Sequence, residues 1–352
     1  MSESKLQIGF LGLGWVFENI WYPIFSELLP TAKFSGLDPF IKRQACTNFK
    51  QLDEGTFWKK KYDLVVIATP NNMHSKQALH AISLGFNVLI EKPVCLKRQS
   101  WQNIIALSKI NEVLVFPSAA IPYRTDILYF QKIIRDSQLG QARYIEADWV
   151  RSRGIPGAAS WFTNSTVSGG GVLQDLGWHL LDLVFRLYDD FPVEQYFATQ
   201  TSDFLGNENF EANWKLSTAG TKEHNRSSIV PDSALLFLKF DSEKSARIRV
   251  GWASHLRGDE SRLLLVCENG ELELTTLFGF SPDRRSEAKL ILHQNHKGQR
   301  LTLPKVRRRE EYLRFAQSII NRIKRSDDPH ADREYSRVDM ICNIMEGISH
   351  AD

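Results

Sequence analysis

Short continuous runs of apolar residues alternate with longer amphipathic segments in the first third of the chain. The run at residues 63–68 is rich in β-branched side chains, which is typical of a parallel strand buried on both faces. Apolar residues recur at helical spacing over residues 15–29 and 73–84, so we expect helices there. Further strands are expected at residues 6–11, 33–38, 87–90 and 113–116. This alternation predicts an α/β fold with a doubly wound parallel (Rossmann) sheet.

The remainder of the chain is dominated by strand-like segments. Residues 142–151 alternate between apolar and polar side chains, and similar runs occur at residues 233–240, 246–252, 262–267, 271–275 and 289–292. Asn269-Gly270 between two of these runs is a hairpin turn signal. Helices are expected at residues 308–324 and 333–349, and the polar stretch at residues 207–228 is expected to be a long exposed insertion.

Length and composition limit the class of protein. A chain of 352 residues exceeds one ordinary core, so we expect two domains. The hydrophobic content of 43% and the charged content of 24% are normal for a globular protein. A net charge of +3 gives no case for a concentrated basic surface, so a nucleic-acid partner is not expected.

The cysteines and the apolar runs indicate the cellular compartment in which the protein is expected. Cys46, Cys95, Cys267 and Cys342 are widely spaced and show no metal-binding or redox motif, which predicts ordinary thiols and no metal site. No apolar stretch reaches the ~20 residues that a membrane-spanning helix needs, and no signal-peptide pattern is present. We therefore expect a cytoplasmic protein with no membrane partner.

A glycine turn follows the first predicted strand. Gly12 and Gly14 permit a tight turn and allow a pyrophosphate to approach the backbone at a helix N-terminus. The third glycine of the dinucleotide-binding fingerprint is replaced by Phe17, which predicts looser or re-angled packing of the helix on the sheet. The turn therefore indicates a dinucleotide site that departs from the usual pattern.

An acidic residue ends the second predicted strand. Asp38 stands where a carboxylate accepts hydrogen bonds from the adenosine ribose and repels the additional phosphate of NADP. NAD is therefore the expected cofactor, while Lys42 and Arg43 just beyond leave NADP open. The alternative for Asp38 is a helix cap beside Pro39.

Two further strand ends carry polar residues. Thr69-Pro70-Asn71-Asn72, with His74 after it, follows one strand, and Glu91-Lys92-Pro93 follows the next. A lysine placed beside a nicotinamide can hold a substrate hydroxyl or carbonyl through a charged hydrogen bond. The alternative for Lys92 is a solvated side chain in a surface turn.

Three glycines at residues 169–171 lead into a segment with helical periodicity. Asp175, His179 and Asp182 recur at helical spacing and share one face, away from the apolar stripe. An acid and an imidazole on one face suit proton transfer, because histidine changes charge near neutral pH. Asp182 has the alternative role of a local salt-bridge partner, and His179 that of a satisfied core histidine.

Together these motifs resemble the Gfo/Idh/MocA family, the glucose-fructose oxidoreductase and inositol dehydrogenase group. The resemblance covers nearly the whole chain and is weakest at residues 203–229. It implies a dinucleotide-binding domain at residues 1–122 and a substrate-binding and oligomerisation domain at residues 123–352. The second domain is expected to be α+β, with a large, mostly antiparallel open sheet. Whether the last helices pack back on the first domain stays open.

The family also implies roles for individual residues. Lys92 would polarise the reacting oxygen, His179 would be the general acid/base, and Asp175 would orient substrate or relay the proton. The residues expected to bind the cofactor are Gly12, Gly14, Trp15, Val16, Asp38, Thr69, Pro70, Asn71, His74, Glu91, Lys92 and Pro93. The implied reaction passes a hydride between nicotinamide and a carbon of a sugar or cyclitol.

The substrate pocket is less well defined by the sequence. Arg151, Trp161 and Asn164 suit sugar hydroxyls or a sugar face, with ordinary loop packing as the alternative. Residues 117–120 read Pro-Ser-Ala-Ala where many relatives carry a polar residue that reaches the active site. Other hypotheses are a NADPH-dependent reductase of an imine or conjugated double bond, and a non-catalytic dinucleotide sensor. The open sheet predicts a homo-oligomer, either a dimer or a tetramer.

Overall fold

The computed structural model describes residues 6–157, 160–212, 230–241, 243–281, 286–325 and 328–349. The chain forms two compact units, one of Met1–Ala120 with Arg308–Cys342 and the other of Ile121–Arg307 with Asn343–Asp352. Residues 213–228, which are most of the predicted insertion at residues 207–228, lie outside the described residues. Within the part of the chain that is described, no helix combines the length and apolar character needed to cross a membrane.

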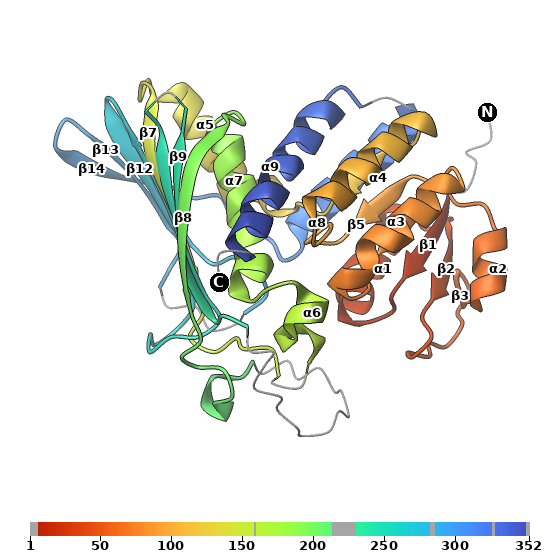
Figure 1. Ribbon diagram of the computed structural model, residues 1–352. Helices are drawn as coiled ribbons and strands as arrows, with labels where there is room; N and C mark the ends of the chain where they lie inside the picture. The colour runs from red at the N-terminus through yellow and green to blue at the C-terminus, as the bar shows by residue number, and fades with distance from the viewer. Residues whose placement is uncertain are drawn as a thin grey trace. The chain divides into compact units, whose positions relative to one another are not determined.

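The first unit contains a six-stranded sheet in the order β3-β2-β1-β4-β5-β6, and all its neighbouring strands are parallel (Figure 1). The strands are β1 (Gln7–Leu11), β2 (Lys33–Leu37), β3 (Phe49–Gln51), β4 (Leu64–Ile67), β5 (Val88–Ile90) and β6 (Val115–Pro117). Every side chain of β4 is buried, as its apolar sequence predicts.

Helices connect these strands. They are η1 (Phe17–Trp21), α1 (Tyr22–Leu28), α2 (Glu54–Lys59), η2 (Asn71–Met73), α3 (His74–Ser83) and α4 (Arg98–Ile110). Late in the chain come α8 (Glu310–Arg325), which also belongs to this unit, and α9 (Ala331–Ser349), which is divided between the two units. Helix α3 packs against α4, and α1 packs against α8. The order of the strands reverses between β1 and β4, and ligands of such sheets bind beyond the carboxyl ends of the strands at this point.

The second unit is built on an eight-stranded sheet in the order β14-β13-β12-β11-β7-β10-β9-β8. Strands β7 and β10 pair in parallel and the other neighbours are antiparallel. The strands are β7 (Ala142–Val150), β8 (Val193–Thr201), β9 (Ser233–Phe240), β10 (Ser245–Gly251), β11 (Glu260–Cys267), β12 (Gly270–Thr276), β13 (Lys289–Gln294) and β14 (Lys297–Leu301). The predicted fold class is thereby confirmed for both sheets.

Helices cover one face of this second sheet. The helices of this unit include η3 (Ile121–Tyr123), α5 (Thr125–Asp136), η4 (Trp161–Thr163), α6 (Ser165–Ser168), η5 (Leu173–Gly177), α7 (Trp178–Leu187) and η6 (Glu208–Phe210), of which α5, η5 and α7 contact the sheet. Helix α7 packs on β7 and β10, and α5 packs on β12 (Figure 1). On β10 the alternate residues Ala246, Ile248 and Val250 are fully buried under these helices, whereas Arg249 between them is exposed. Among the described residues, exposed side chains such as Arg249, Phe197 and Phe237 lie on the other face of the sheet, which is open there.

Candidate functional site

The glycine turn after β1 is fixed by close approach of another strand end. Gly12 has φ +85°, and a Cβ there would lie 2.5 Å from the carbonyl oxygen of Ala68. Its N–H donates to the carbonyl of Leu37 at 3.0 Å, so the turn is held between the ends of β2 and β4. Only glycine satisfies both constraints. A Cβ added at Gly14 would make an ordinary van der Waals contact with Ile41 Cδ1 at 3.9 Å, so the space around Gly14 does not by itself require glycine.

Asp38, at the end of β2, closes this turn from the side. Its Oδ2 accepts from the Leu13 N–H at 2.9 Å, and its Oδ1 accepts from the N–H groups of Phe40 and Ile41 at 2.8 and 2.9 Å. The carboxylate is thus held against the glycine turn, where a ribose would lie in a bound dinucleotide. No helix follows Pro39, so the alternative of a helix cap is not borne out; the contacts with the N–H groups of Phe40 and Ile41 instead close a turn.

Arg43 is committed to other partners. Its guanidinium forms a bidentate ion pair with Glu18, with both N–O distances 2.9 Å, and donates to the Leu13 carbonyl at 2.9 and 3.1 Å. Placing a 2′-phosphate on this group would compete with these contacts.

Phe17 shows how the chain accommodates the missing third glycine. Its ring is buried and packs against Phe10, Tyr22 and Phe49, with centroid distances of 5.1, 5.2 and 5.3 Å. A π-helical turn, η1, begins at this residue, where the sequence predicts a regular helix. Such wider turns often occur at functional sites, and here the turn makes room for an aromatic cluster beneath the glycine turn.

The strand ends after β4 and β5 are tied together. His74 is buried, and its Nδ1 and Nε2 each lie 2.8 Å from a main-chain carbonyl oxygen, of Pro93 and Thr69 respectively. Glu91 accepts from Trp21 Nε1 at 2.7 Å. Lys92 is half-buried at the carboxyl end of β5, and its peptide bond to Pro93 is cis.

Ser118 belongs to the same group of side chains. Its hydroxyl donates to Glu91 Oε1 at 3.0 Å, beside the Trp21 contact. The hydroxyl at this position therefore serves to hold Glu91, the neighbour of Lys92. The Thr69 hydroxyl donates to Gln77 at 2.6 Å, which fixes the turn after β4.

In the second unit, the glycines before η5 bring the helix start against another segment. A Cβ on Gly171 would lie 1.8 Å from the Pro231 carbonyl oxygen, to which the Val172 N–H donates at 2.9 Å. Only glycine permits this contact. It places Asp175 and His179, one helical turn apart, above the sheet.

Asp175 is oriented by a tryptophan that the sequence analysis did not select. Trp252, which follows β10 and is fully buried, donates from Nε1 to Asp175 Oδ2 at 2.8 Å. The His179 ring lies beside Trp149 of β7, with centroids 5.8 Å apart. The carboxylate and the imidazole are therefore each held against a buried indole.

Arg151 adds a positive charge to this group. Its guanidinium lies 5.5 Å from the centre of the Trp149 ring. Burial lowers the pKa of Arg151, and the negative charges of Asp175 and Asp259 oppose that shift. Asp259 accepts from Ser152 through Oδ1, while its buried Oδ2 has no hydrogen-bond partner among the described residues. Asp175, Asp259 and the Arg151 guanidinium thus lie near one another, and Arg151 and His179 both lie beside Trp149.

The remaining predicted residues have local roles. Asp182 Oδ2 accepts from Arg186 Nε at 2.9 Å, which is the salt bridge considered as its alternative. Asn164 caps α6 by accepting from the Thr166 N–H at 3.0 Å, and the Trp161 ring stacks on Phe162 at 3.9 Å. Contact of Trp161 and Asn164 with substrate stays a prediction.

Comparison with known proteins identifies the family. The family model described as "Oxidoreductase family, NAD-binding Rossmann fold" matches residues 31–118, and that of the GFO/IDH/MocA C-terminal domain matches residues 127–273. A putative UDP-kanosamine synthase oxidoreductase subunit of Amycolatopsis mediterranei is 30% identical over 96% of this chain and 93% of its own length. The chain belongs to the Gfo/Idh/MocA family.

Solved structures share the fold of this Gfo/Idh/MocA protein. An aldose-aldose oxidoreductase from Caulobacter crescentus, complexed with glycerol, superposes with a TM-score of 0.74 at 18% identity, covering 99% of this chain and 98% of its own. GenD2 from gentamicin A biosynthesis, in complex with NAD, gives a TM-score of 0.71 at 18% identity over 99% and 95% of the two chains. The first unit is thus a NAD-binding Rossmann domain, and the expected nicotinamide dinucleotide cofactor is confirmed.

Proposed function

We propose that this protein is a NAD-dependent dehydrogenase or reductase that acts on a hydroxyl or carbonyl carbon of a sugar or cyclitol. The observation that carries the proposal is the Asp175–His179 pair, with Asp175 oriented by Trp252 and with Arg151 alongside. Names of family relatives add support, since they include a UDP-kanosamine synthase subunit and an aldose-aldose oxidoreductase. UDP-linked hexoses therefore belong in the first substrate screen.

Different residues of the chain would bind the cofactor, stabilise charge on the reacting oxygen and transfer its proton. Gly12, Gly14, Trp15, Val16 and Asp38 would hold the adenosine and pyrophosphate part of the dinucleotide, with the remaining cofactor-binding residues at the ends of β4 and β5. When bound, the nicotinamide accepts or supplies the hydride. The Lys92 ammonium stabilises negative charge on the reacting oxygen, and His179 takes or returns its proton. Asp175 orients the substrate or relays that proton.

NAD is proposed over NADP from the side chains at the end of β2. The Asp38 carboxylate lies against the glycine turn, where it would repel a 2′-phosphate. Arg43, a cation that would attract that phosphate, is paired with Glu18. Fluorescence titration with NADH and NADPH tests this directly; preference for NADPH would contradict it and would favour the reductase of an imine or double bond.

Turnover of sugars, cyclitols and UDP-hexoses with NAD tests the reaction. Lys92→Ala and His179→Ala are each expected to abolish turnover while leaving NADH affinity and folding unchanged. Lys97→Ala, which removes an exposed ammonium further along the same loop, is the matched control and should keep full activity. Near-normal turnover in both variants would refute the mechanism. NADH binding without turnover of any compound would favour the dinucleotide sensor.

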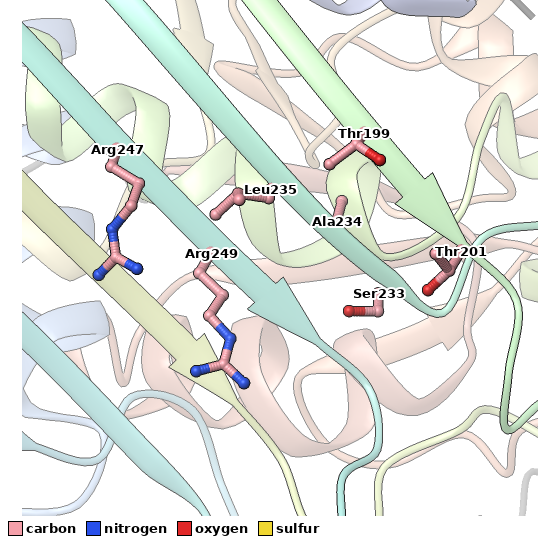
Figure 2. A pocket seen from close by; sticks show the side chains of 7 residues that line it. All are labelled: Thr199, Thr201, Ser233, Ala234, Leu235, Arg247 and Arg249. Atoms are coloured by element: carbon pink, nitrogen blue, oxygen red, sulfur yellow. The ribbon is translucent and has the colours of Figure 1, made fainter.

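The open face of the eight-stranded sheet is the proposed contact with a second copy of the chain. Phe197 and Phe237 pair across β8 and β9, and both are exposed, by 66% and 42%. Beside them is a shallow groove of about 320 Å³ (Figure 2), lined by Thr199, Thr201, Ser233, Ala234, Leu235, Arg247 and Arg249. Exposed apolar side chains gathered in this way are typical of an interface.

Charges on this face favour self-association. Arg247 pairs with Glu146 and Asp148, and Arg262 pairs with Glu146 and Glu273, so both signs alternate over the central strands. Two copies related by a two-fold axis can therefore match acidic with basic groups. Sedimentation of Phe197→Asp and Phe237→Asp should show monomers. Ile110→Asp, at a 77% exposed position of the first unit, should retain the oligomer. Unchanged sedimentation of both phenylalanine variants would refute this interface.

A further inference from the structure

His74 joins two turns that leave the first sheet at neighbouring strands. It begins α3, its side chain is 1% exposed, and both ring nitrogens lie 2.8 Å from carbonyl oxygens. Nε2 faces the Thr69 carbonyl, after β4, and Nδ1 faces the Pro93 carbonyl, after β5. Strands β4 and β5 pair in parallel, so the ring spans two adjacent strand ends.

The chemistry of these contacts leaves no ring nitrogen for a ligand. A carbonyl oxygen only accepts hydrogen bonds, so each contact needs an N–H on the imidazole. The neutral ring has one N–H and can donate to one carbonyl at a time, whereas the imidazolium donates to both. Burial lowers the pKa of the ring, and the charge of Lys92 acts in the same direction, whereas the two carbonyl contacts and Glu91 oppose that shift. The neutral ring is thereby favoured, and it donates to one of the two carbonyls at a time. An indirect role therefore fits His74 better than the direct cofactor contact expected from the sequence.

Pro93 directly follows Lys92, so a bond to the Pro93 carbonyl constrains the backbone from which the Lys92 side chain starts. The other side of Lys92 is held by Glu91, which accepts from Trp21, Ser118 and the Lys92 N–H itself. We propose that His74 is a positioning residue that, through the Pro93 carbonyl, sets the place of the Lys92 ammonium, and through the Thr69 carbonyl, sets the turn that binds the nicotinamide cofactor. This inference rests on the proposed function, because it assigns Lys92 to the reacting oxygen.

Two variants separate the contact of His74 with the Pro93 carbonyl from its contact with the Thr69 carbonyl. The amide nitrogen of asparagine takes the place of His Nδ1, and that of glutamine takes the place of Nε2, so His74→Asn retains a donor toward Pro93 and His74→Gln retains one toward Thr69. Both substitutions remove the ring, so each is the control for the other. His74→Gln should lower kcat about five- to tenfold with little change in KM for NAD, as expected for loss of one positioning hydrogen bond. His74→Asn should keep kcat within about twofold and raise KM for NAD by about five- to tenfold.

Amide hydrogen exchange tests the same two contacts of His74 without requiring turnover. In His74→Gln the amides of residues 92–95 should exchange faster and those of residues 69–72 should not; His74→Asn should show the reverse. If the wild type turns over a sugar and both variants show the same kinetics and exchange, the positioning role is wrong and the proposed function stands. If no substrate is turned over, the proposed function is wrong, and the difference in amide exchange between the two variants alone decides the role of His74.

Wild-type protein labelled with ¹⁵N at histidine provides a measurement that needs no variant. A ring N–H of His74 that is protected from solvent exchange is expected from its buried contacts with the two carbonyls. A freely exchanging ring would refute the proposal even where the variants fail to fold.

Discussion

The contact between Trp252 and Asp175 yields the sharpest test of the second unit. Trp252→Phe removes the indole N–H that donates to Asp175 Oδ2 at 2.8 Å and retains an aromatic ring in the core. Trp252 is fully buried, so no water replaces the lost donor without entering the core. The carboxylate then loses the indole N–H that holds its Oδ2.

The size of the effect follows from the type of bond. A hydrogen bond to a charged acceptor contributes roughly 1.5–3 kcal/mol, and the lower end applies because Asp175 is only partly buried. About 1.4 kcal/mol corresponds to a tenfold change in rate. If the orientation of Asp175 matters in the transition state, kcat should fall by about tenfold.

The control is Trp101→Phe, the same substitution at a buried tryptophan of the first unit. The Trp101 Nε1 donates to the Tyr335 carbonyl at 3.0 Å, so this variant also loses one hydrogen bond and one indole. Urea denaturation should show a similar loss of stability, about 1–3 kcal/mol, in the two variants. Only Trp252→Phe should lower kcat, and NADH affinity should be unchanged in both. Equal kcat in the two variants would refute a role for Trp252 in orienting Asp175.

Three further predictions follow from the described contacts. Asp38→Asn removes the charge and keeps one of the two oxygens that accept from the turn, so NADPH affinity should rise about tenfold relative to NADH in a fluorescence titration; an unchanged ratio would contradict the role of the carboxylate. Burial lowers the pKa of His74 below its ordinary 6.5. Below about pH 6.5 the unfolded chain therefore binds a proton that the folded chain does not, and the free energy of unfolding decreases as the pH is lowered. His74→Gln should reduce that loss between pH 7.5 and 5.5 in urea titrations, and an identical slope would refute it. Asp126→Asn leaves the buried Arg124 without its ion-pair partner at 2.9 Å and should cost about 3–5 kcal/mol of unfolding free energy; a loss under about 1 kcal/mol would count against this.

Periodicity predicted the strands whose burial is one-sided or complete. β4 and β10 were predicted because their apolar residues are continuous in the first case and alternate in the second. The predictions omitted β3, β8 and β14. β3 has three residues, and β8 and β14 are edge strands with mostly exposed, largely polar side chains, so burial leaves little pattern in their sequences.

By itself the sequence determined most strands of both sheets, the glycine turn and the helical face that carries Asp175 and His179, because each depends on residues close together in the chain. It also indicated the family, since the motifs occur in the family's order. Tertiary structure decided the partners of those residues. Trp252 reaches Asp175, and Pro93 reaches His74, only because strands bring distant segments together. A single sequence records which groups donate and accept, whereas the pairing of strands determines which donor meets which acceptor.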